Sequence, residues 1–371
     1  MRLLHVYKDF YPPVSGGMER HIGLMCRFQR QWAEVRALVC SRGPRTRRVV
    51  RDGTEVIEVG EFGRLQSAPL APAFPLWLRR LEADVIVVHM PNPTAEAACL
   101  LAHPRAKIVV RYHSDVVRQA SAMKLYRPVL MQFLRKADMI LPTSAQYVAS
   151  SPHLQAVREK CQVVPLGILP EEFEAPAPER IAAVRARYGG EYVLFSGVHR
   201  YYKGLPYLVR AAADIQAPLV IAGDGPERPA VMALAAELGV PIHFPGALSH
   251  EDLVTHLHGC AVFAFPSCER SEAFGISILE AHACGKPVVA TRLGTGVEFV
   301  NLDGQTGVNV APREPAAFAA AVNRLLLEPE IRARMGAFAK DRIAREFDAR
   351  TVARREMDLY EEVAGCRQSH T

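Results

Sequence analysis

Ala261–Pro266 (AVFAFP) is an apolar run, and Ser271–Glu280 (SEAFGISILE) follows it with two carboxylates, Glu272 and Glu280. The order of apolar run, polar turn, glycine and amphipathic stretch predicts a buried strand, a loop and a helix. Gly275 then falls at the helix N-terminus, where unpaired N–H groups and the helix dipole favour an anion. The segment therefore offers an anion site between a loop carboxylate and a helix carboxylate, and a diphosphate with a sugar on either side would fit it.

Short apolar runs alternate with longer amphipathic stretches along the rest of the chain. The runs are rich in Val and Ile and lack polar alternation, which is typical of parallel strands covered by helices on both faces. In the first half we expect strands at Leu3–Tyr7, Val35–Val39, Glu55–Val59, Asp84–His89, Lys107–Tyr112, Met139–Pro142 and Gln162–Pro165. In the second half we expect strands at Tyr192–Ser196, Leu219–Ala222, Ile242–Phe244, Val262–Phe265, Pro287–Ala290 and Gly307–Val310, with helices that include Lys203–Ile215 and Pro229–Leu238.

The length of 371 residues and this alternation predict two domains. Both are expected to be doubly wound, Rossmann-like α/β domains that bind ligands at the carboxyl ends of their strands and face a common cleft. The acidic, proline-containing stretch Glu171–Glu179 is typical of a linker. The expected division is a first domain over residues 1–168, a linker and the start of the second domain over 169–190, the second domain over 191–346 and a C-terminal helix over 347–371.

The composition is that of a globular protein, with 49% hydrophobic and 23% charged residues. No apolar run is long enough to span a bilayer, and Met1–Lys8 is too short and too soon charged for a secretory signal, so we expect a cytoplasmic protein. None of the eight cysteines are spaced as C-x-x-C, which argues against zinc and thioredoxin-like sites. Most of them are expected to be small buried hydrophobic residues.

Charge is unevenly distributed along the chain, whose net charge is +6. Residues 1–166 carry 24 Lys and Arg against 13 Asp and Glu, whereas residues 167–371 carry 21 against 26. The basic half is either drawn to an anionic surface, such as a cytoplasmic leaflet or a lipid-phosphate acceptor, or simply well solvated. No nucleic-acid motif accompanies the charge, so no nucleic-acid partner is expected.

Two loops of the first half follow predicted strands. Gly16 and Gly17 come after the first strand and before a helical stretch, where they would let the backbone approach a phosphate. A tight strand–helix turn would have the same sequence, and the G-x-G-x-x-G fingerprint is absent. His113 follows Lys107–Tyr112 and either contacts a sugar or is structural.

Loops of the second half show the same placement. Gly197 opens a loop that brings Arg200 and Lys203 close to a helix N-terminus, where two cations would neutralise a diphosphate leaving group, although a solvated basic loop is the alternative. Gly246 follows another strand and could line a base pocket. Gly294–Glu298 also follows a strand and could bring backbone N–H groups to the ligand.

At this point the residues resemble a known family. Pro266–Ser267, Glu272–Ile276 and Glu280–Val288 look like the E-x7-E segment of retaining glycosyltransferases of family 4, within group 1, which have the GT-B fold. The likeness covers essentially the whole chain, and it includes the Gly16-Gly17 loop, His113, the Arg200–Gly204 segment and the Gly223–Pro226 turn. It implies two Rossmann-like domains and a final helix, from Phe347 to about Ala364, that crosses back onto the first domain.

The resemblance also implies roles for individual residues. Glu280 is similar to the glutamate that hydrogen-bonds the ribose hydroxyls of a nucleoside-diphosphate sugar, and Glu272 matches the glutamate near the transferred sugar. The implied catalytic residues are His113, Arg200, Lys203 and Glu272. The implied donor-binding residues are Gly16, Gly17, Gly197, Gly246, Phe274, Gly275, Ile276 and Glu280.

The implied reaction transfers a hexose with retention to an acceptor hydroxyl. In a front-face mechanism the leaving phosphate oxygen takes the acceptor proton while Arg200 and Lys203 stabilise the departing charge. Glu272 acting as a covalent nucleophile is the alternative. No aspartate-rich metal motif stands out, so no metal and no other cofactor are expected.

One loop departs from the commonest family pattern, since Leu293–Asn301 replaces the usual Gly-Gly-x-x-Glu form. It resembles bacterial mannosyl- and rhamnosyltransferases of O-antigen and exopolysaccharide assembly. This favours a GDP-mannose-type donor, with UDP-sugars open, and a glycan or lipid-linked acceptor in cell-surface polysaccharide synthesis. The alternatives are a sugar-nucleotide epimerase on the same fold, a phosphorylase-like enzyme with a cofactor-bearing lysine, and a non-catalytic nucleotide-sugar-binding protein.

Overall fold

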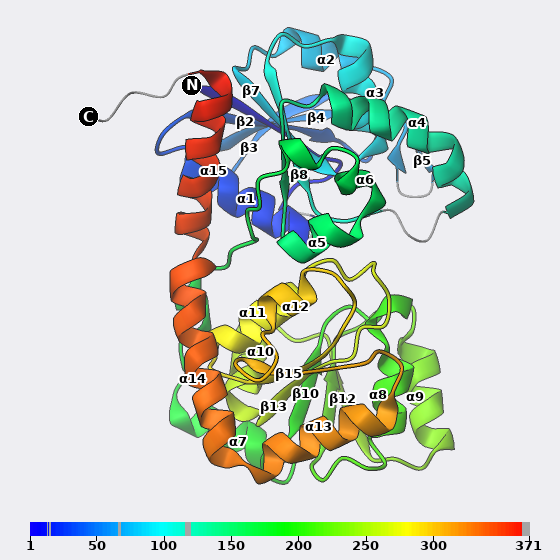
Figure 1. Ribbon diagram of the computed structural model, residues 1–371, viewed down its shortest axis with the longest axis vertical. Helices are drawn as coiled ribbons and strands as arrows, with labels where there is room; N and C mark the ends of the chain where they lie inside the picture. Colours follow the sequence, from blue (N-terminus) through cyan, green and yellow to red (C-terminus); the bar gives the residue numbers. More distant parts are fainter. Residues whose placement is uncertain (13, 15, 66–67, 116–119, 366–371) are drawn as a thin grey trace. The chain divides into compact units, whose positions relative to one another are not determined.

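The computed structural model describes residues 1–12, 14, 16–65, 68–115 and 120–365, and their contacts divide the chain into two units. Unit 1 joins residues 1–167 to the segment that begins at Ala349, and unit 2 comprises Ile168–Asp348. Figure 1 shows both units. The sequence-based boundary at 168 and the return of the chain near 347 lie next to these bounds.

Unit 1 is built on a seven-stranded sheet of order β3-β4-β2-β1-β7-β8-β9. All neighbours pair in parallel except β3, which is antiparallel to β4. The strands are β1 (Arg2–Val6), β2 (Glu34–Cys40), β3 (Arg47–Arg51), β4 (Thr54–Val59), β7 (Val85–Met90), β8 (Lys107–Tyr112) and β9 (Met139–Pro142). A separate two-stranded antiparallel sheet pairs β5 (Arg64–Leu65) with β6 (Ala68–Pro69).

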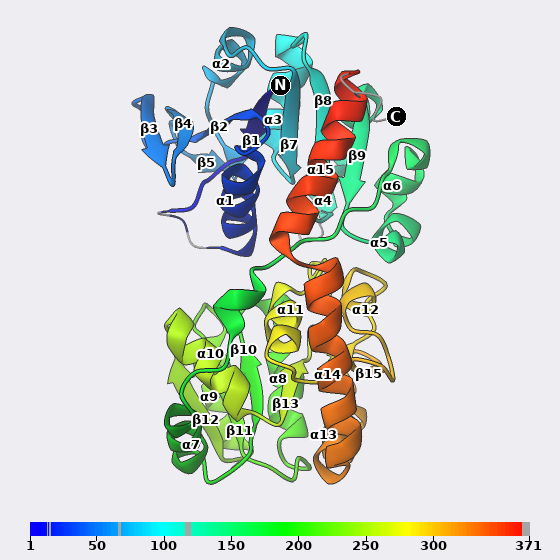
Figure 2. The ribbon, with the colours of Figure 1, turned by 90° about the vertical axis from the view of Figure 1, so that its left-hand side faces the viewer.

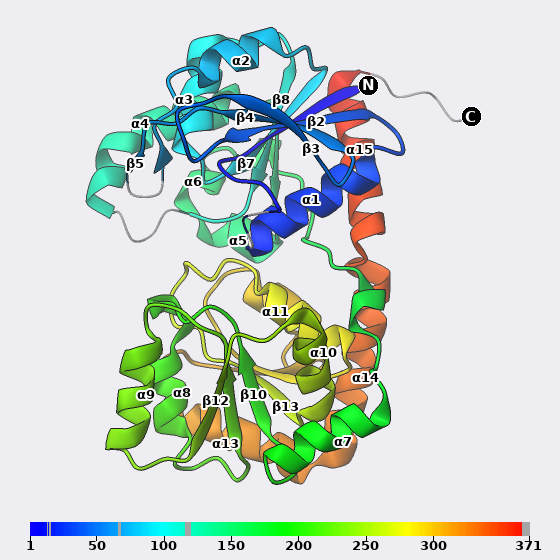
Figure 3. The same ribbon diagram turned by 180° about the vertical axis from the view of Figure 1, so that it is seen from behind.

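Helices cover both faces of this sheet. They are α1 (Gly17–Gln29), α2 (Phe74–Arg80), α3 (Pro93–Ala102), α4 (Ala120–Lys136), α5 (Ala145–Ser150), α6 (Pro152–Gln155), the 3₁₀ turn η1 (Arg158–Lys160) and α15 (Ala349–Ala364). α3 packs against α2 and α4, whereas α1 packs against α15 (Figure 3). The chain leaves β1 toward β2 and leaves β7 toward β8, so right-handed crossovers place α1 and α3 on opposite faces. The order therefore reverses between β1 and β7, where open α/β sheets bind ligands.

The last helix belongs to unit 1, as the resemblance implies. α15 contacts β7 and β8 as well as α1 (Figure 2). Val352, Met357 and Tyr360 are buried at its inner face. Because these residues recur at helical spacing, burial of one apolar stripe explains why this helix docks on the sheet.

Unit 2 repeats the same design with a six-stranded parallel sheet of order β12-β11-β10-β13-β14-β15. Its strands are β10 (Val193–Ser196), β11 (Leu219–Ala222), β12 (Ile242–Gly246), β13 (Val262–Phe265), β14 (Val288–Thr291) and β15 (Gly307–Val310). From β10 the next strands, β11 and β12, are added on one side of the sheet, whereas β13, β14 and β15 are added on the other side. The order therefore reverses between β10 and β13, and the loops that follow these two strands meet at one edge.

The helices of unit 2 also lie in two layers. They are η2 (Pro170–Phe173), α7 (Pro178–Arg187), η3 (Tyr201–Lys203), α8 (Leu205–Ala211), α9 (Arg228–Glu237), α10 (His250–Gly259), α11 (Ile276–Ala283), α12 (Val297–Val300), α13 (Pro315–Leu327) and α14 (Pro329–Glu346). α8 packs against α9 and α13, whereas α11 packs against α14, and α7 against α10. The core between the first layer and the sheet includes Phe195, Leu208 and Phe318. The expectation of two doubly wound α/β domains is thus confirmed.

Three sequence-based details need correction. Gln162–Pro165 is not a strand, although the amides of Gln162 and Val164 donate to β9, because the Arg111 guanidinium takes the Val164 and Pro165 carbonyls that a further strand would need. The antiparallel edge strand β3 was not expected. The segment interpreted as a linker packs on unit 2, where Phe173 is buried.

The cysteines agree with the expectation of buried thiols. Among the described residues all seven are free, and Cys26, Cys40, Cys99, Cys260 and Cys284 are buried. Cys366 lies outside the described residues.

Candidate functional site

An ion pair between Lys203 and Glu272 lies where the strand order of unit 2 reverses. Lys203 ends the η3 turn after β10, and Glu272 lies in the loop after β13. The Lys203 Nζ atom is 2.6 Å from Glu272 Oε2, and Ser267 Oγ donates to the same oxygen at 3.1 Å. The two charged side chains are only 12% and 11% exposed. The structure thus brings two predicted site residues together, 69 positions apart in the chain.

The surroundings of Lys203 keep its ammonium charged. Burial by itself lowers the pKa of Lys203, but the neighbouring negative charges of Glu272 and Glu280 outweigh it, so the pKa is raised. The Nζ atom also lies 5.0 Å from the centre of the Phe265 ring and 5.5 Å from that of Tyr202, within the range of a cation–π contact. A fixed positive charge therefore stands at the carboxyl edge of the sheet, close to Glu280 as well as to Glu272.

Glycine is required where the two loops approach each other. Gly204 follows Lys203 with φ +67°, and a Cβ there would collide with the Pro266 carbonyl oxygen. The turn that carries Lys203 can pack against the end of β13 only because this position lacks a side chain.

Gly275 shapes the start of α11. It adopts φ +87°, and a Cβ there would lie 2.9 Å from Ile278 Cδ1. No described side chain caps this helix, and its first turn contains no acidic residue. The first N–H groups, including that of Ile276, therefore remain available to an anion, as the sequence predicts.

The side chain of Phe274 has a structural position. It is buried against the rings of Phe299 and Phe347, with centroid separations of 6.5 and 6.3 Å. This aromatic cluster anchors the loop between Glu272 and α11. Any contact of Phe274 with a donor would therefore come from its backbone.

A second loop holds the Glu272 segment in place. Thr295 Oγ1 donates to the Glu272 carbonyl oxygen at 2.9 Å. The Glu298 carboxylate accepts the N–H groups of Gly294 at 2.7 Å and of Thr295 at 3.3 Å. The sequence identified this loop only as a possible source of N–H groups. The Ser267 and Thr295 hydroxyls that fix Glu272 were missed, since serine and threonine in loops carry no specific signal.

The remaining predicted residues of unit 2 lie at different distances from this edge. Arg200 is exposed and directly precedes η3. Glu280 is half-buried on α11. Gly197 follows β10 directly with φ +155°, whereas Gly246 ends β12 with φ +82° and is separated from β10 by β11.

Gly16 and Gly17 lie at the start of α1 in unit 1, as predicted. Gly16 is the N-cap residue of α1, and a side chain there would collide with the Glu19 carboxylate. This carboxylate is buried against the first turn, and burial raises its pKa. The first turn of α1 thus already contains an acidic side chain close to Gly16.

His113 belongs to a row of buried histidines in unit 1. Its Nε2 atom is 3.0 Å from His89 Nδ1, and His89 Nε2 is 2.9 Å from His5 Nδ1. Burial lowers the pKa of His5 to about 4 and holds the pKa values of His89 and His113 well below their ordinary value. The sequence identified only His113. Histidine within a run of buried Val and Ile, as at His5 and His89, is the signal that could have found the others.

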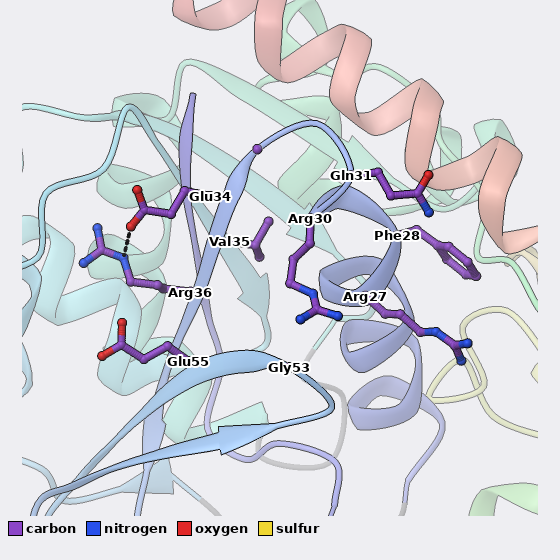
Figure 4. A pocket seen from close by; sticks show the side chains of 10 residues that line it. Arg27, Phe28, Arg30, Gln31, Glu34, Val35, Arg36, Gly53 and Glu55 are labelled. Carbon is purple, nitrogen blue, oxygen red and sulfur yellow. Dashed lines mark ion pairs between the residues drawn. The ribbon is translucent and has the colours of Figure 1, made fainter.

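An open pocket of about 710 Å³ lies elsewhere in unit 1 (Figure 4). Its wall is formed by the end of α1 and by residues of β2 and β4. The lining residues are Arg27, Phe28, Arg30, Gln31, Ala33, Glu34, Val35, Arg36, Gly53 and Glu55. They include none of the predicted site residues, all of which are described.

Over the described ranges, no helix combines the length and the hydropathy that crossing a membrane demands.

Solved structures share this fold. Sucrose-phosphate synthase from Thermosynechococcus elongatus matches with a TM-score of 0.83 at 20% identity, over 99% of this chain and 100% of that chain. Anabaena HepE, solved in complex with UDP, matches with a TM-score of 0.79 at 19% identity, over 98% and 100%. The predicted GT-B arrangement of two Rossmann-like domains is confirmed at the level of fold.

Sequence comparison identifies the family. D-rhamnosyltransferase WbpZ from Pseudomonas aeruginosa is 37% identical over 94% of this chain and 93% of its own length. O-antigen chain mannosyltransferase C from Escherichia coli is 34% identical over 97% and 98%. Residues 16–167 match the profile of the glycosyl transferase 4-like domain, and residues 178–342 match that of the group 1 glycosyl transferases. The chain belongs to the group 1 glycosyltransferases.

Proposed function

We propose that this glycosyltransferase moves a hexose, with retention, from a nucleoside-diphosphate sugar to a hydroxyl group of a glycan or lipid-linked acceptor in O-antigen synthesis. The observation that carries the proposal is the buried Lys203–Glu272 ion pair beside the uncapped N-terminus of α11. A cation and free N–H groups at one sheet edge suit a diphosphate. The flanking carboxylates of Glu272 and Glu280 suit the hydroxyl groups of the sugars on the two sides of the diphosphate.

Each side chain has a role in this proposal. Lys203 and Arg200 bind the diphosphate together with the N–H groups of Gly275 and Ile276. Glu280 accepts hydrogen bonds from the ribose hydroxyls. Glu272 faces the transferred sugar. Its ion pair with Lys203 also keeps the Lys203 ammonium charged and in position.

The proposed chemistry is a front-face displacement. The bond between the anomeric carbon and the diphosphate oxygen breaks, and the acceptor oxygen forms its bond on the same face. The acceptor proton passes to the leaving phosphate oxygen, and Lys203 stabilises the negative charge that remains. No step requires a metal ion, because the positive side chains fill that role.

The relatives support the choice of donor and acceptor. One is named a D-rhamnosyltransferase, another an O-antigen chain mannosyltransferase and a third a GDP-mannose-dependent mannosyltransferase. These names favour a GDP-mannose-type donor over a UDP-sugar. They also favour a growing cell-surface glycan as the acceptor.

The proposed site of action is the cytoplasmic face of the membrane, where unit 1 would bind peripherally. Its support is the positive charge of residues 1–166 and the exposed apolar side chains of Trp32, Phe62 and Leu65. Flotation with anionic vesicles at low salt, lost at high salt and absent with neutral vesicles, is the expected result. Absence of flotation under all three conditions would leave the charge as solvation only.

The transfer itself is tested with GDP-mannose and UDP-glucose as donors and a lipid-linked glycan as acceptor. We expect nucleoside diphosphate release that depends on the acceptor, and a product whose anomeric configuration by NMR equals that of the donor. Inversion would contradict the front-face mechanism. Conversion of the donor without acceptor would indicate an epimerase, and binding without turnover a non-catalytic protein.

A further inference from the structure

A continuous line of buried polar side chains in unit 1 ends at His113. It begins with Arg111 on β8 and Glu356 on α15, passes through Gln29 at the end of α1, and continues through the histidine row. Arg111 Nε is 2.8 Å from Glu356 Oε1, Gln29 Nε2 donates to Glu356 Oε2 at 2.8 Å, and Gln29 Oε1 is 2.7 Å from His5 Nε2. The most exposed member of the line, His113, is only 4% exposed. All these side chains are therefore shielded from bulk solvent.

The ion pair at the start gives the line a direction. Arg111 is fully buried, and a guanidinium stays protonated. A buried cation needs a counter-ion, and Glu356 supplies it as a carboxylate. Burial raises the pKa of Glu356, while Arg111, Tyr360 and Gln29 stabilise its charged form.

A carboxylate only accepts hydrogen bonds, so the next group has no choice of orientation. The Gln29 amide must direct its nitrogen to Glu356 and its oxygen to His5. His5 therefore carries its proton on Nε2, the nitrogen that faces the Gln29 oxygen.

Each neutral histidine then transmits the same orientation. A neutral imidazole that donates from one nitrogen accepts at the other. His5 donates from Nε2 and accepts at Nδ1 from His89 Nε2, and His89 in turn accepts at Nδ1 from His113 Nε2. This sequence holds because burial keeps all three rings uncharged. His113 is left with its proton on Nε2 and a bare lone pair on Nδ1.

That lone pair has no partner among the residues that the structure describes. His113 Nδ1 is a buried polar atom without a hydrogen bond. Its neighbour His21 approaches only as a ring edge, with a centroid separation of 6.1 Å, and Arg111 is the nearby charge that further lowers the pKa of His113. A buried unsatisfied acceptor in a native fold points to a bound group that donates to it.

We propose that Gln29, His5 and His89 are positioning residues that hold His113 in the Nε2–H tautomer, so that Nδ1 accepts a hydrogen bond from a sugar hydroxyl. The identity of the hydroxyl rests on the proposed glycosyl transfer, whereas the tautomer follows from unit 1 alone. A phosphate oxygen cannot donate and would be repelled by the lone pair. This line of side chains from Arg111 to His113, the relay, therefore directs His113 to a sugar rather than to the diphosphate.

The test is an NMR experiment on the full chain labelled with ¹⁵N at histidine. Two-bond proton–nitrogen correlations at neutral pH distinguish the two tautomers from the imidazolium, and a His113→Gln variant assigns the signals. Gln29→Leu cuts the relay two histidines away from His113. Gln31→Leu makes the same chemical change at an exposed position of the same segment and serves as the control.

We expect a protonated Nε2 and a bare Nδ1 in the wild-type protein and in Gln31→Leu, and a mixture of tautomers in Gln29→Leu. The kcat/KM for transfer should fall roughly three- to tenfold in Gln29→Leu, the size of one uncharged hydrogen bond, and stay unchanged in Gln31→Leu. A wild-type His113 protonated on Nδ1 or doubly protonated overturns the proposal, and this reading stands even if Gln29→Leu does not fold. An unchanged His113 spectrum in folded Gln29→Leu overturns it as well. The expected spectra in a protein without transferase activity would support the relay and overturn the proposed function alone.

Discussion

The two units place opposite chemistry at equivalent positions of the same fold. At the reversal point of unit 2, Lys203 and Glu272 form an ion pair at 2.6 Å, and the neighbouring negative charges raise the pKa of Lys203. Near the reversal point of unit 1, His89 and His113 contact each other at 3.0 Å as neutral rings, because burial lowers their pKa values without a carboxylate beside them. The difference in charge supports the proposal that the unit 2 site binds an anion and that the unit 1 site binds uncharged hydroxyl groups.

The largest expected effect comes from removing the positive charge of Lys203 in unit 2. Lys203→Ala should lower kcat/KM for transfer by about 10²- to 10³-fold, because the leaving diphosphate loses a preorganised cation. Steady-state kinetics measure the loss. Arg313→Ala is the matched control, since it breaks an exposed ion pair with Glu269 near the same segment and should retain activity. Wild-type kinetics in Lys203→Ala would remove the diphosphate role.

A substitution at Gly204 should disturb the same site through the backbone, because it separates the two loops that carry Lys203 and Glu272. Gly204→Ala combines a positive φ with a collision against Pro266, whereas Gly239→Ala has a similar φ of +63° and open space around it. Strain alone costs about 1 kcal/mol, so the free energy of unfolding should fall by that amount in Gly239→Ala and by about 3 kcal/mol in Gly204→Ala. Chemical denaturation provides both values. Equal losses would mean that the close approach of the two loops does not contribute.

The Glu280 carboxylate should affect nucleotide binding more than turnover. Glu280→Ala would remove the proposed hydrogen bonds to the ribose hydroxyls, so the Kd of the nucleotide should rise roughly tenfold or more. Isothermal titration calorimetry measures this change. Glu269→Ala removes a partly exposed carboxylate of the loop before α11 and should leave the Kd unaltered. An unchanged Kd in Glu280→Ala would exclude the ribose contact.

The neutral histidines of unit 1 predict how stability depends on pH. The pKa of His5 is about 4 in the folded chain and about 6.5 when unfolded, so the unfolded chain binds more protons between these values. Its stabilising contribution is complete above pH 6.5 and is lost as the pH falls toward 4, by up to about 1.4 kcal/mol per pH unit. Denaturation at pH 7, 6 and 5 should show this slope, and His5→Leu should reduce it. A flat profile would mean that the row does not titrate as described.

The sequence predicted the site residues of unit 2 far better than those of unit 1, for a physical reason. Glu272, Gly275 and Glu280 lie within nine consecutive residues, so spacing and helix geometry relate them directly. The relay in unit 1 joins Gln29, His89 and Glu356 from distant segments, and no local pattern connects them. Long-range packing of α15 brings Glu356 to the sheet, which only the folded chain shows.

The strands show the same division between local and distant causes. Buried apolar runs such as Lys107–Tyr112 and Val262–Phe265 were placed with the bounds that the structure has. Gln162–Pro165 was wrong because a distant arginine, Arg111, takes its carbonyl groups. The edge strand β3 was missed because three of its five residues are arginines and Val50 is exposed, so no buried apolar run marks it.

The central claim is that the reversal point of unit 2 binds the diphosphate of a nucleotide sugar through Lys203. Calorimetric titration of GDP and GMP into the wild-type protein and Lys203→Ala, with UDP and UMP in parallel, tests it most directly. We predict that the wild-type protein prefers the diphosphate over the monophosphate of its base, and that Lys203→Ala loses most of this preference while it still binds the monophosphate. An equal preference in both proteins would contradict the account.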